Sequence, residues 1–470
     1  MQAPAQAFAP TSRREDETVT PGAYEFAMTI TRRTLLVGAG AFALPAISPS
    51  AALASDGFTR LEALDLGGGR LGYTVDGISR EIRLPRGQEL RVRLVNRLDR
   101  PTSVHWRGVR GPSAMDGVAP LVQKAVEPGG SFDYRFTPPD AGLFLFHAHA
   151  EPDFASQVER GLAGLLVVED PAAPPVDHEF VVALSEQARP EACPGVFAHT
   201  AGEIAGADRG GVAIAVNGAL APWTRTAAPG ARVRVRFANL TTGRLLPLAI
   251  EGVQSYVVAV DGQPCTPFEP LRNVVPCPPG ARFDLVFDMP RTAGEKVRVL
   301  LSGAPGEDIL AFTAEGAAVE ARPPVASAAA NPLLPEVIHL QKARRMELVL
   351  DATAPGDPAS CPDSAPSIWR INGKPAGAAP LFSVRRGTPV SLAFVNKSAA
   401  HVVMRLHGHV MRQLHALDDG WDPYWRDAVV VPAGRTVRVA FVADNPGRWR
   451  IGAGVLPHAT GGLATFFDVT

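Results

Sequence analysis

The chain contains three copies of one sequence unit, and this repeat restricts the fold more than any other feature. In each copy a glycine-containing turn precedes a stretch that alternates apolar and polar residues and ends in Asn, nine residues after a Gly. The alternating stretches occupy residues 90–96, 233–239 and 390–396. A second turn and a second alternating stretch follow in every copy. Strict alternation is typical of half-buried strands, so the repeat predicts an all-β chain of three tandem sandwiches or barrels.

The length of the chain agrees with several domains. A chain of 470 residues is too long for one ordinary hydrophobic core. Stretches rich in Pro and Ala near 170–177 and 322–335 are typical of linkers. We therefore predict domains at 55–170, 171–325 and 326–470.

Residues 1–54 read as an upstream extension followed by an export signal. Arg32 and Arg33 precede an apolar run from Leu35 to Ile47, and Ala52-Leu53-Ala54 offers a small-residue cleavage site. The paired arginines resemble a twin-arginine (Tat) signal, which predicts a periplasmic or other extracytoplasmic location with no membrane span after cleavage. An uncleaved N-terminal anchor is the alternative, and either Met1 or Met28 could be the true start.

The charge balance argues against a nucleic-acid partner. The chain has 46 Lys and Arg against 47 Asp and Glu, a net charge of −1. Binding to nucleic acid or to an anionic membrane usually requires an excess of basic residues. We expect neither partner.

Four cysteines lie beyond the predicted signal. In an oxidising compartment they could form two disulfides in three possible pairings. Cys265 and Cys277 are close in sequence and are the favoured pair. None of the cysteines is in a histidine-rich segment, so we do not interpret them as metal ligands. The four cysteines of the chain are Cys193, Cys265, Cys277 and Cys361.

Four short segments share an alternating pattern that suits a metal site. Residues two apart on a strand project from the same face, so a His-x-His pair aims two imidazoles at one point. His147-Ala148-His149 is such a pair, whereas His105-Trp106-Arg107 and Arg405-Leu406-His407 each combine one imidazole with one guanidinium. The fourth segment, Gly452-Ala453-Gly454, has neither. Since these segments belong to the first and third copies, a site built from them would lie between those two domains.

These segments resemble the three-domain multicopper oxidases of the laccase type. The resemblance covers about residues 75–469 and includes Met115-Asp116-Gly117, Leu406-His407-Gly408-His409 and the stretch from Ala443 to Trp449. It implies three cupredoxin-like Greek-key domains, copper as the cofactor and descent from an oxidoreductase.

The sequence departs from the family where the copper ligands are expected. The family holds a three-copper cluster with eight histidines, and the resemblance places four of them here at His105, His147, His149 and His407. Arg107, Arg405, Gly452 and Gly454 take the other four places. At the family's mononuclear copper site His458 remains, but Ala453 stands at the cysteine position, Val402 at the other histidine and Leu463 at the axial ligand. Blue copper requires a thiolate, so we do not expect ordinary laccase activity.

Two functional hypotheses follow. The first is a non-oxidase binding or scaffold protein of the cell envelope, with an unknown envelope partner or a small molecule as its ligand. There Arg107 and Arg405 replace the metal and bond to acceptors across the interface. The second is a copper-binding oxidoreductase with at most one ion. A guanidinium about 5 Å from a divalent ion costs about 6–7 kcal/mol at an effective dielectric constant of about 20, which weighs against the second. The candidate ligands of that ion are His105, His147, His149 and His407.

Overall fold

The computed structural model is almost entirely strands, which confirms the all-β prediction. The predicted signal, Cys193 and Cys361 lie outside the residues that the structure describes. Among the described residues no helix is both long and apolar enough to cross a bilayer. The described residues are 57–188, 212–302, 308–352, 369–375, 377, 379–415 and 420–470.

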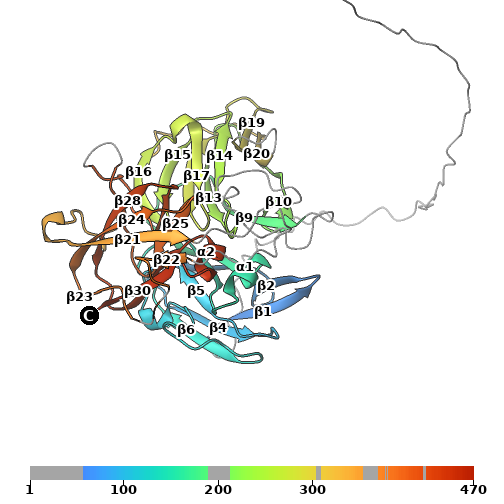
Figure 1. Cartoon of the computed structure of the whole chain (residues 1–470). Coiled ribbons are helices and arrows are strands. Elements are labelled where there is room, and N and C mark those ends of the chain that lie inside the picture. The colour runs from blue at the N-terminus through green and yellow to red at the C-terminus, as the bar shows by residue number, and fades with distance from the viewer. Residues whose placement is uncertain are drawn as a thin grey trace, which may run out of the picture. The chain divides into compact units, whose positions relative to one another are not determined.

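The strands form three consecutive pairs of sheets (Figure 1). The first pair has the orders β2-β1-β4-β6 and β3-β8-β7-β5, the second β11-β10-β9-β13-β18-β15-β16 and β12-β20-β19-β14-β17, and the third β22-β21-β24-β28-β26 and β23-β30-β29-β25-β27. Each pair falls within one predicted domain, although the exact domain limits stay predictions.

The strands and the short helices have the following bounds. The first pair of sheets contains β1 Thr59–Gly67, β2 Arg70–Val75, β3 Glu81–Pro85, β4 Leu90–Asn96, β5 Val104–Arg107, β6 Ser131–Phe136, β7 Gly142–Ala148 and β8 Ala163–Glu169. The second contains β9 His178–Ala188, β10 Val212–Val216, β11 Ala219–Leu220, β12 Trp223–Ala227, β13 Arg232–Asn239, β14 Leu246–Glu251, β15 Tyr256–Val260, β16 Gln263–Phe268, β17 Val274–Cys277, β18 Arg282–Asp288, β19 Lys296–Leu301 and β20 Asp308–Ala314. The third contains β21 Arg344–Ala352, β22 Trp369–Ile371, β23 Ser383–Val384, β24 Thr388–Asn396, β25 Val402–Leu406, β26 Arg412–Gln413, β27 Ala428–Val431, β28 Thr436–Ala443, β29 Gly447–Ala453 and β30 Ala464–Val469. The helical segments are α1 Phe154–Glu159, α2 Leu456–Thr460, η1 Ser113–Met115, η3 Leu271–Asn273 and η4 Leu340–Lys342.

The sequence repeat corresponds to a repeated strand arrangement. Its first alternating stretch is β4, β13 or β24, and each of these pairs in parallel with the first strand of its domain. On its other side each pairs antiparallel with the second alternating stretch, β6, β18 or β28. The three copies therefore share the same strand pairing and register.

The Asn that ends each repeat is buried and bonds to the backbone. Asn96 Nδ2 donates to the carbonyl oxygens of Arg100 and Val126, both at 2.8 Å. Asn239 and Asn396 make the equivalent pairs of bonds at 2.8–3.0 Å. One buried amide thus bonds to two backbone carbonyls in every copy, which explains why the same residue ends all three strands.

The hydrophobic core is divided unequally among the domains. Residues of the first and third domains form one continuous apolar cluster, which includes Trp106, Phe146, Phe441 and Trp449. The second domain has a cluster of its own around Phe237. The junction of the first and third domains is therefore packed like an interior, and polar groups placed there are shielded from water.

The expected pairing of Cys265 with Cys277 is wrong. Both thiols are free and buried. Cys265 lies on β16 and Cys277 on β17, and these strands belong to different sheets of the second domain. Each Sγ contacts a different carbonyl oxygen, that of Val257 at 3.9 Å and that of Ala281 at 3.8 Å. Closeness in sequence does not bring two cysteines together when a turn carries the chain from one sheet to the other.

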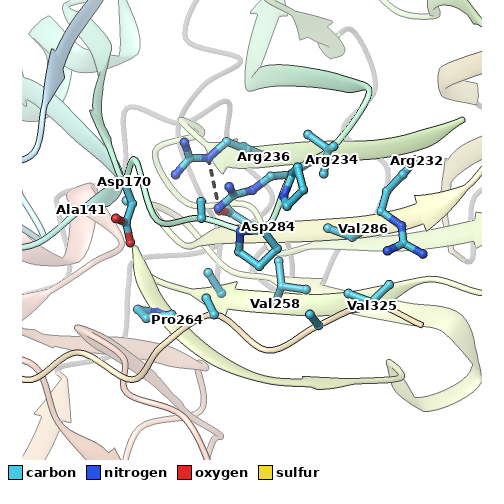
Figure 2. Close-up of a pocket in the computed structure, with 18 of the residues that line it drawn as sticks. Ala141, Asp170, Arg232, Arg234, Arg236, Val258, Pro264, Asp284, Val286 and Val325 are labelled. Atoms are coloured by element: carbon cyan, nitrogen blue, oxygen red, sulfur yellow. Dashed lines mark hydrogen bonds and ion pairs between the residues drawn. The ribbon is translucent and has the colours of Figure 1, made fainter. Parts of the chain in front are cut away.

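The two predicted linkers lie against the second domain, over the face of its larger sheet that carries the arginines of β13 (Figure 2). Asp177 in the first linker accepts a bond from the backbone N–H of Arg232 at 2.7 Å. In the second linker the carbonyl oxygen of Pro323 accepts from Arg232 Nη2, also at 2.7 Å. Arg322 then forms an ion pair with Asp177 and so joins one linker to the other.

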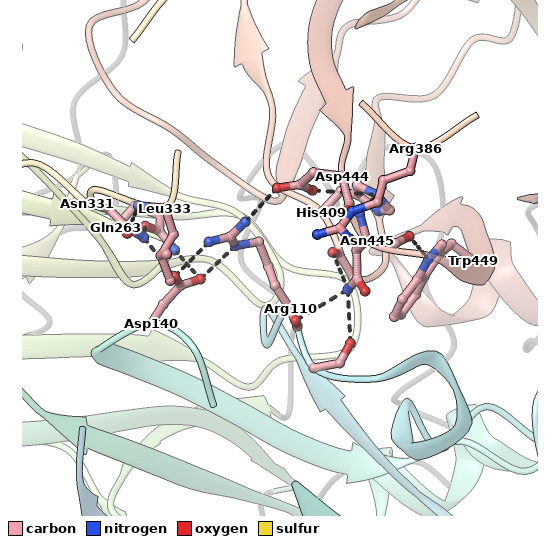
Figure 3. Close-up of polar contacts among 12 residues, drawn as sticks. Arg110, Asp140, Gln263, Asn331, Leu333, Arg386, His409, Asp444, Asn445 and Trp449 are labelled. Carbon is pink, nitrogen blue, oxygen red and sulfur yellow. Dashed lines mark hydrogen bonds and ion pairs between the residues drawn. The ribbon is translucent and has the colours of Figure 1, made fainter. Parts of the chain in front are cut away.

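A polar junction connects all three domains (Figure 3). Arg110 of the first domain donates twice to Asp140 at 2.8 Å and once to Asp444 of the third domain at 3.2 Å. Asn331 of the second linker donates to Asp140 at 2.7 Å and to Gln263 of the second domain at 2.8 Å. These charge-assisted bonds fix the third domain against the first, next to the histidine-rich segments.

Candidate functional site

The histidine-rich segments converge from three strands. β5 carries His105 and Arg107, β7 carries His147 with His149 just beyond its end, and β25 carries Arg405 with His407 just beyond its end. His105 and His147 are direct cross-strand neighbours in the β5–β7 pair. All six side chains are buried. The structure thus brings these predicted residues together at the junction of the first and third domains.

The four candidate ligand histidines form one compact cluster. The rings of His105 and His407 are stacked, with centroids 4.1 Å apart. The His105 centroid lies 5.3 Å from that of His147 and 5.4 Å from that of His149. The His149 and His407 centroids are 5.8 Å apart. Residues up to 302 positions apart in sequence thus place their imidazoles around one small volume.

Asp116 holds two of these rings. Its Oδ2 accepts from Nδ1 of His407 at 3.0 Å, and its Oδ1 lies 3.2 Å from Nδ1 of His105, which also bonds to the Asp116 carbonyl oxygen at 2.8 Å. Burial opposes ionisation, but the imidazoles of His105 and His407 hold the pKa of Asp116 well below its usual range. The three residues also form a group in which one ligand atom from each lies within 4.8 Å of the others. Sequence analysis gave Asp116 no role beyond its place in a family motif.

Arg405 determines the tautomer of His105. Its Nη2 lies 3.2 Å from His105 Nε2. A guanidinium can only donate, so Nε2 accepts and the proton of the neutral ring is on Nδ1, where it is donated to Asp116. Burial, which disfavours the imidazolium, lowers the pKa of His105 and keeps the ring neutral.

Arg107 bonds in another direction. Its Nη2 donates to the carbonyl oxygen of Pro279, in the second domain, at 2.8 Å. The guanidinium packs over Gly280, where an added Cβ would lie 1.8 Å from Arg107 Cζ. An added Cβ at Gly454 would lie 3.2 Å from Arg107 Nη2. Arg107 therefore occupies space next to the position where the resemblance expected another histidine.

A second buried pair, which the sequence did not indicate, lies next to the arginines. Arg282 of the second domain donates to Asp427 of the third at 2.8 Å, and neither side chain is exposed. Arg282 Nε also bonds to the carbonyl oxygen of Leu143 in the first domain at 3.3 Å. Asp261 Oδ2 accepts from the Asp427 backbone N–H at 3.0 Å. Arg282 thus contacts all three domains.

The charges of this buried group balance in number. Three arginines stand against three aspartates, and every side chain is at most 5% exposed. Burial lowers the pKa of Arg107 to about 10 and that of Arg405 well below its usual value, while Asp427 opposes both shifts. The group, called here the buried ion network, is Arg107, Arg282, Arg405, Asp116, Asp261 and Asp427.

The intact His-x-His pair has nitrogens with no hydrogen-bond partner. His147 Nδ1 bonds to the Ala148 carbonyl oxygen at 2.8 Å, but its Nε2 has no partner among the described residues. Neither nitrogen of His149 has one in the same part of the chain, and its ring stacks on Phe154 at 4.2 Å. Buried unpaired imidazole nitrogens are uncommon in structures and are available as metal ligands.

Comparison with known proteins identifies the family. Sequence models described as multicopper oxidase match residues 73–173, 183–312 and 341–470, one model for each pair of sheets. The chain belongs to the multicopper oxidase family. Its three domains are accordingly cupredoxin-like, and membership in the family implies copper.

The relatives cover most of the chain. "Multicopper oxidase MmcO" of Mycobacterium tuberculosis is 29% identical, over 82% of this chain and 80% of its own length. The crystal structure of a multi-copper oxidase from Pseudomonas thermotolerans is 29% identical, covers 87% of this chain and 98% of its own, and has a TM-score of 0.73. The crystal structure of a multi-copper oxidase from Pseudomonas parafulva is 26% identical, covers 88% of this chain and 100% of its own, and has a TM-score of 0.70.

The residues that the resemblance places at the mononuclear copper site are also buried. Val402, Ala453 and Leu463 have almost no exposed surface. His458 on α2 packs against Trp369, with ring centroids 4.7 Å apart, and its Nδ1 has no partner within the described residues. Burial lowers the pKa of His458 to about 4, so the ring is neutral near pH 7.

Proposed function

We propose that this chain is an exported member of the multicopper oxidase family that acts as a binding or scaffold protein and not as an oxidase. One observation carries the proposal: the Arg405 guanidinium donates to His105 Nε2 at 3.2 Å. Because His105 Nδ1 bonds to Asp116, Nε2 is the nitrogen of this ring that could bind a metal. A permanent cation there competes with copper for the same lone pair.

The residues present do not fit a three-copper cluster. Four imidazoles are available where the family uses eight, and two of the other positions hold buried guanidinium groups. A divalent ion about 5 Å from one guanidinium is destabilised by about 6–7 kcal/mol at an effective dielectric constant of about 20. Arg107 and Arg405 belong to the buried ion network, in which three aspartates accompany the three arginines. We therefore derive no catalytic step through copper.

The mononuclear position supports the same proposal. Ala453, at the position of the copper-binding cysteine, is buried and offers only a methyl group. Cys265 and Cys277, the thiols that the structure describes, lie on β16 and β17 of the second domain and not in this part of the fold. A blue copper site without a thiolate has no route for electrons from a reducing substrate.

In this proposal the buried ion network joins the domains. Arg405 of the third domain bonds to His105 of the first, Arg107 of the first bonds to the second, and Arg282 of the second bonds to Asp427 of the third. The bonding of Arg405 agrees with the hypothesis of contact across the interface of the first and third domains. Arg107 differs, since it bonds to the second domain.

Metal analysis of protein produced with copper in the medium tests the proposal. We expect far less than one copper ion per chain, an intact fold by circular dichroism, and no dioxygen uptake with a phenol as reductant. A copper-loaded laccase is the positive control. Stoichiometric copper together with steady dioxygen uptake would overturn the proposal.

The unpaired nitrogens of His147 and His149 favour one second candidate, a copper-binding protein with a single ion on that pair. His147→Ala distinguishes the two candidates. If wild-type protein carries one ion per chain and His147→Ala loses it, while Arg438→Ala on the exposed surface of β28 retains it, the second candidate is correct. No ion in any of the three proteins supports the first.

Export through the twin-arginine route is part of the same proposal and rests on residues 28–54, outside the described residues. Replacement of Arg32 and Arg33 by Lys should leave the protein in the cytoplasmic fraction, while wild type is recovered outside it. Equal recovery of both proteins outside the cytoplasm would contradict this route. The envelope partner or small-molecule ligand of the protein also remains a proposal.

A further inference from the structure

A pocket of about 180 Å³ lies in the second domain, on the side of its larger sheet that faces away from the hydrophobic core. Its floor is formed by β13, β18, β15 and β16, and its cover by the two interdomain linkers (Figure 2). The histidine cluster is built from β5, β7 and β25, so the pocket is a separate site.

The floor combines a row of arginines with an apolar surface. Arg232, Arg234 and Arg236 alternate along β13 with the core residues Val233 and Val235, and so they share the outer face of the strand (Figure 2). Beside them on the neighbouring strands the lining is apolar, with Val286, Val258 and Pro264.

The cover is rich in proline and is held in place. Pro174, Pro175, Pro323 and Pro324 line it from the two linkers. Arg232 Nη2 bonds to the Pro323 carbonyl oxygen at 2.7 Å, and the linkers are joined by the Asp177–Arg322 ion pair described above. Rigid proline rings above a flat sheet make a narrow space that suits a planar molecule.

The charges on the floor are already compensated. Arg234 and Arg236 both pair with Asp284, and each also lies 3.7 Å from a carboxylate oxygen of Glu179. Arg232 pairs with Asp288 at 2.7 Å. Three cations on the floor therefore face three anions, and an additional charge would be unbalanced. A ligand for this pocket should be uncharged.

One hydrogen-bond donor of the pocket arginines is unused. The Nε–H group of Arg234 is buried and has no hydrogen-bond partner in the described part of the chain. The Nε of Arg236, in contrast, lies 3.2 Å from Asp284 Oδ2. A buried donor without an acceptor costs about 1–3 kcal/mol, so a ligand that brings an acceptor gains this free energy.

We propose that this pocket binds an uncharged, single-ring aromatic molecule with one hydrogen-bond acceptor, such as an aromatic amide or ketone. The volume limits the size, because a cavity of about 150 Å³ already holds benzene. The ring packs against prolines and the flat faces of guanidinium groups, and the acceptor receives the Nε–H of Arg234. The inference does not depend on the function proposed above or on the metal content of the histidine cluster.

Isothermal titration with benzamide and with benzoate tests the proposal on the full mature chain. The two molecules have nearly the same shape and differ in charge. We expect saturable binding of benzamide, and binding of benzoate at least tenfold weaker. If benzoate binds as tightly as benzamide or more tightly, the uncharged class is wrong; if neither binds, the site is wrong.

Three variants locate the binding. Val258→Phe fills the pocket from a half-buried position and should abolish benzamide binding, while Val95→Phe, on a half-buried position of β4 outside the pocket, should not. Arg234→Lys keeps the charge opposite Asp284 but removes the unused Nε–H, and should weaken benzamide binding about tenfold. Binding unchanged in Val258→Phe, with the fold confirmed by circular dichroism, would overturn the assignment to this pocket.

Discussion

Arg405 Nη2 and His105 Nε2 lie 3.2 Å apart, and this contact joins the third domain to the first at the centre of the histidine cluster. In the direction of Asp116, His105 acts as a donor, and in the direction of Arg405 it acts as an acceptor. The ring is therefore one link in a chain of bonds from a carboxylate to a guanidinium. This arrangement uses the imidazole fully without a metal ion.

Replacement of Arg405 by Ala should destabilise the fold. The change removes a buried cation that bonds to His105 and interacts electrostatically with Asp427. Loss of a hydrogen bond made by a charged group usually costs about 1.5–3 kcal/mol. Arg107→Ala should act in the same direction, since it leaves the Pro279 carbonyl without its donor. Urea unfolding of both variants measures the effect, with Arg438→Ala as the exposed control. If neither variant differs from wild type, the arginines do not support the interface.

The Arg282–Asp427 pair should contribute much more than a pair of the same type on the surface. Asp427→Asn removes the charge opposite an arginine with no exposed surface, and we expect a loss of about 3–5 kcal/mol. The matched control is Asp468→Asn, which breaks the exposed Arg448–Asp468 pair and should cost less than about 1 kcal/mol. Equal losses in the two variants would show that burial does not determine the contribution.

Stability should fall between about pH 6.5 and pH 4. Burial lowers the pKa of His409 and of His458 from 6.5 to about 4, so in this range the unfolded chain binds protons that the folded chain does not. Each of these two histidines then reduces the free energy of unfolding by on the order of 3 kcal/mol at pH 4. Above about pH 6.5 both histidines are neutral in the folded and in the unfolded chain, so the lowered pKa no longer affects stability. Urea midpoints measured from pH 8 to pH 4 check this, and a midpoint that is constant from pH 6.5 to pH 4 would contradict it.

The thiols of Cys265 and Cys277 should react only after unfolding. Burial raises the pKa of Cys265 to about 12 and that of Cys277 further still, so neither forms the reactive thiolate in the folded protein. In a chain with Cys193→Ser and Cys361→Ser, iodoacetamide should label nothing in buffer and two thiols in denaturant without reductant. No labelling in denaturant would mean that the two cysteines form a disulfide.

The repeat predicted the fold well because its signals are local. Alternation along 90–96, 233–239 and 390–396 follows directly from the burial of one face of a strand, and the structure has β4, β13 and β24 there. Even the terminal Asn of each copy could be recognised, although its bonds to two backbone carbonyls became visible only in the structure.

The histidine cluster was predicted for a similar reason, but its partners were not. The His-x-His spacing is a local signal, and it brought His105, His147, His149 and His407 together correctly. Arg282 and Asp427 are 145 positions apart, and no local pattern links them. The prediction of a Cys265–Cys277 disulfide was wrong because it relied on closeness in sequence. The turn between the two cysteines carries the chain from one sheet to the other and keeps them apart.

The most direct test of the central claim is a crystal structure of protein produced with copper, with anomalous scattering recorded on both sides of the copper absorption edge. We predict no anomalous peak among His105, His147, His149 and His407, with Arg405 in hydrogen-bond contact with His105. Strong copper peaks among these imidazoles, with the Arg405 guanidinium displaced from His105, would contradict it.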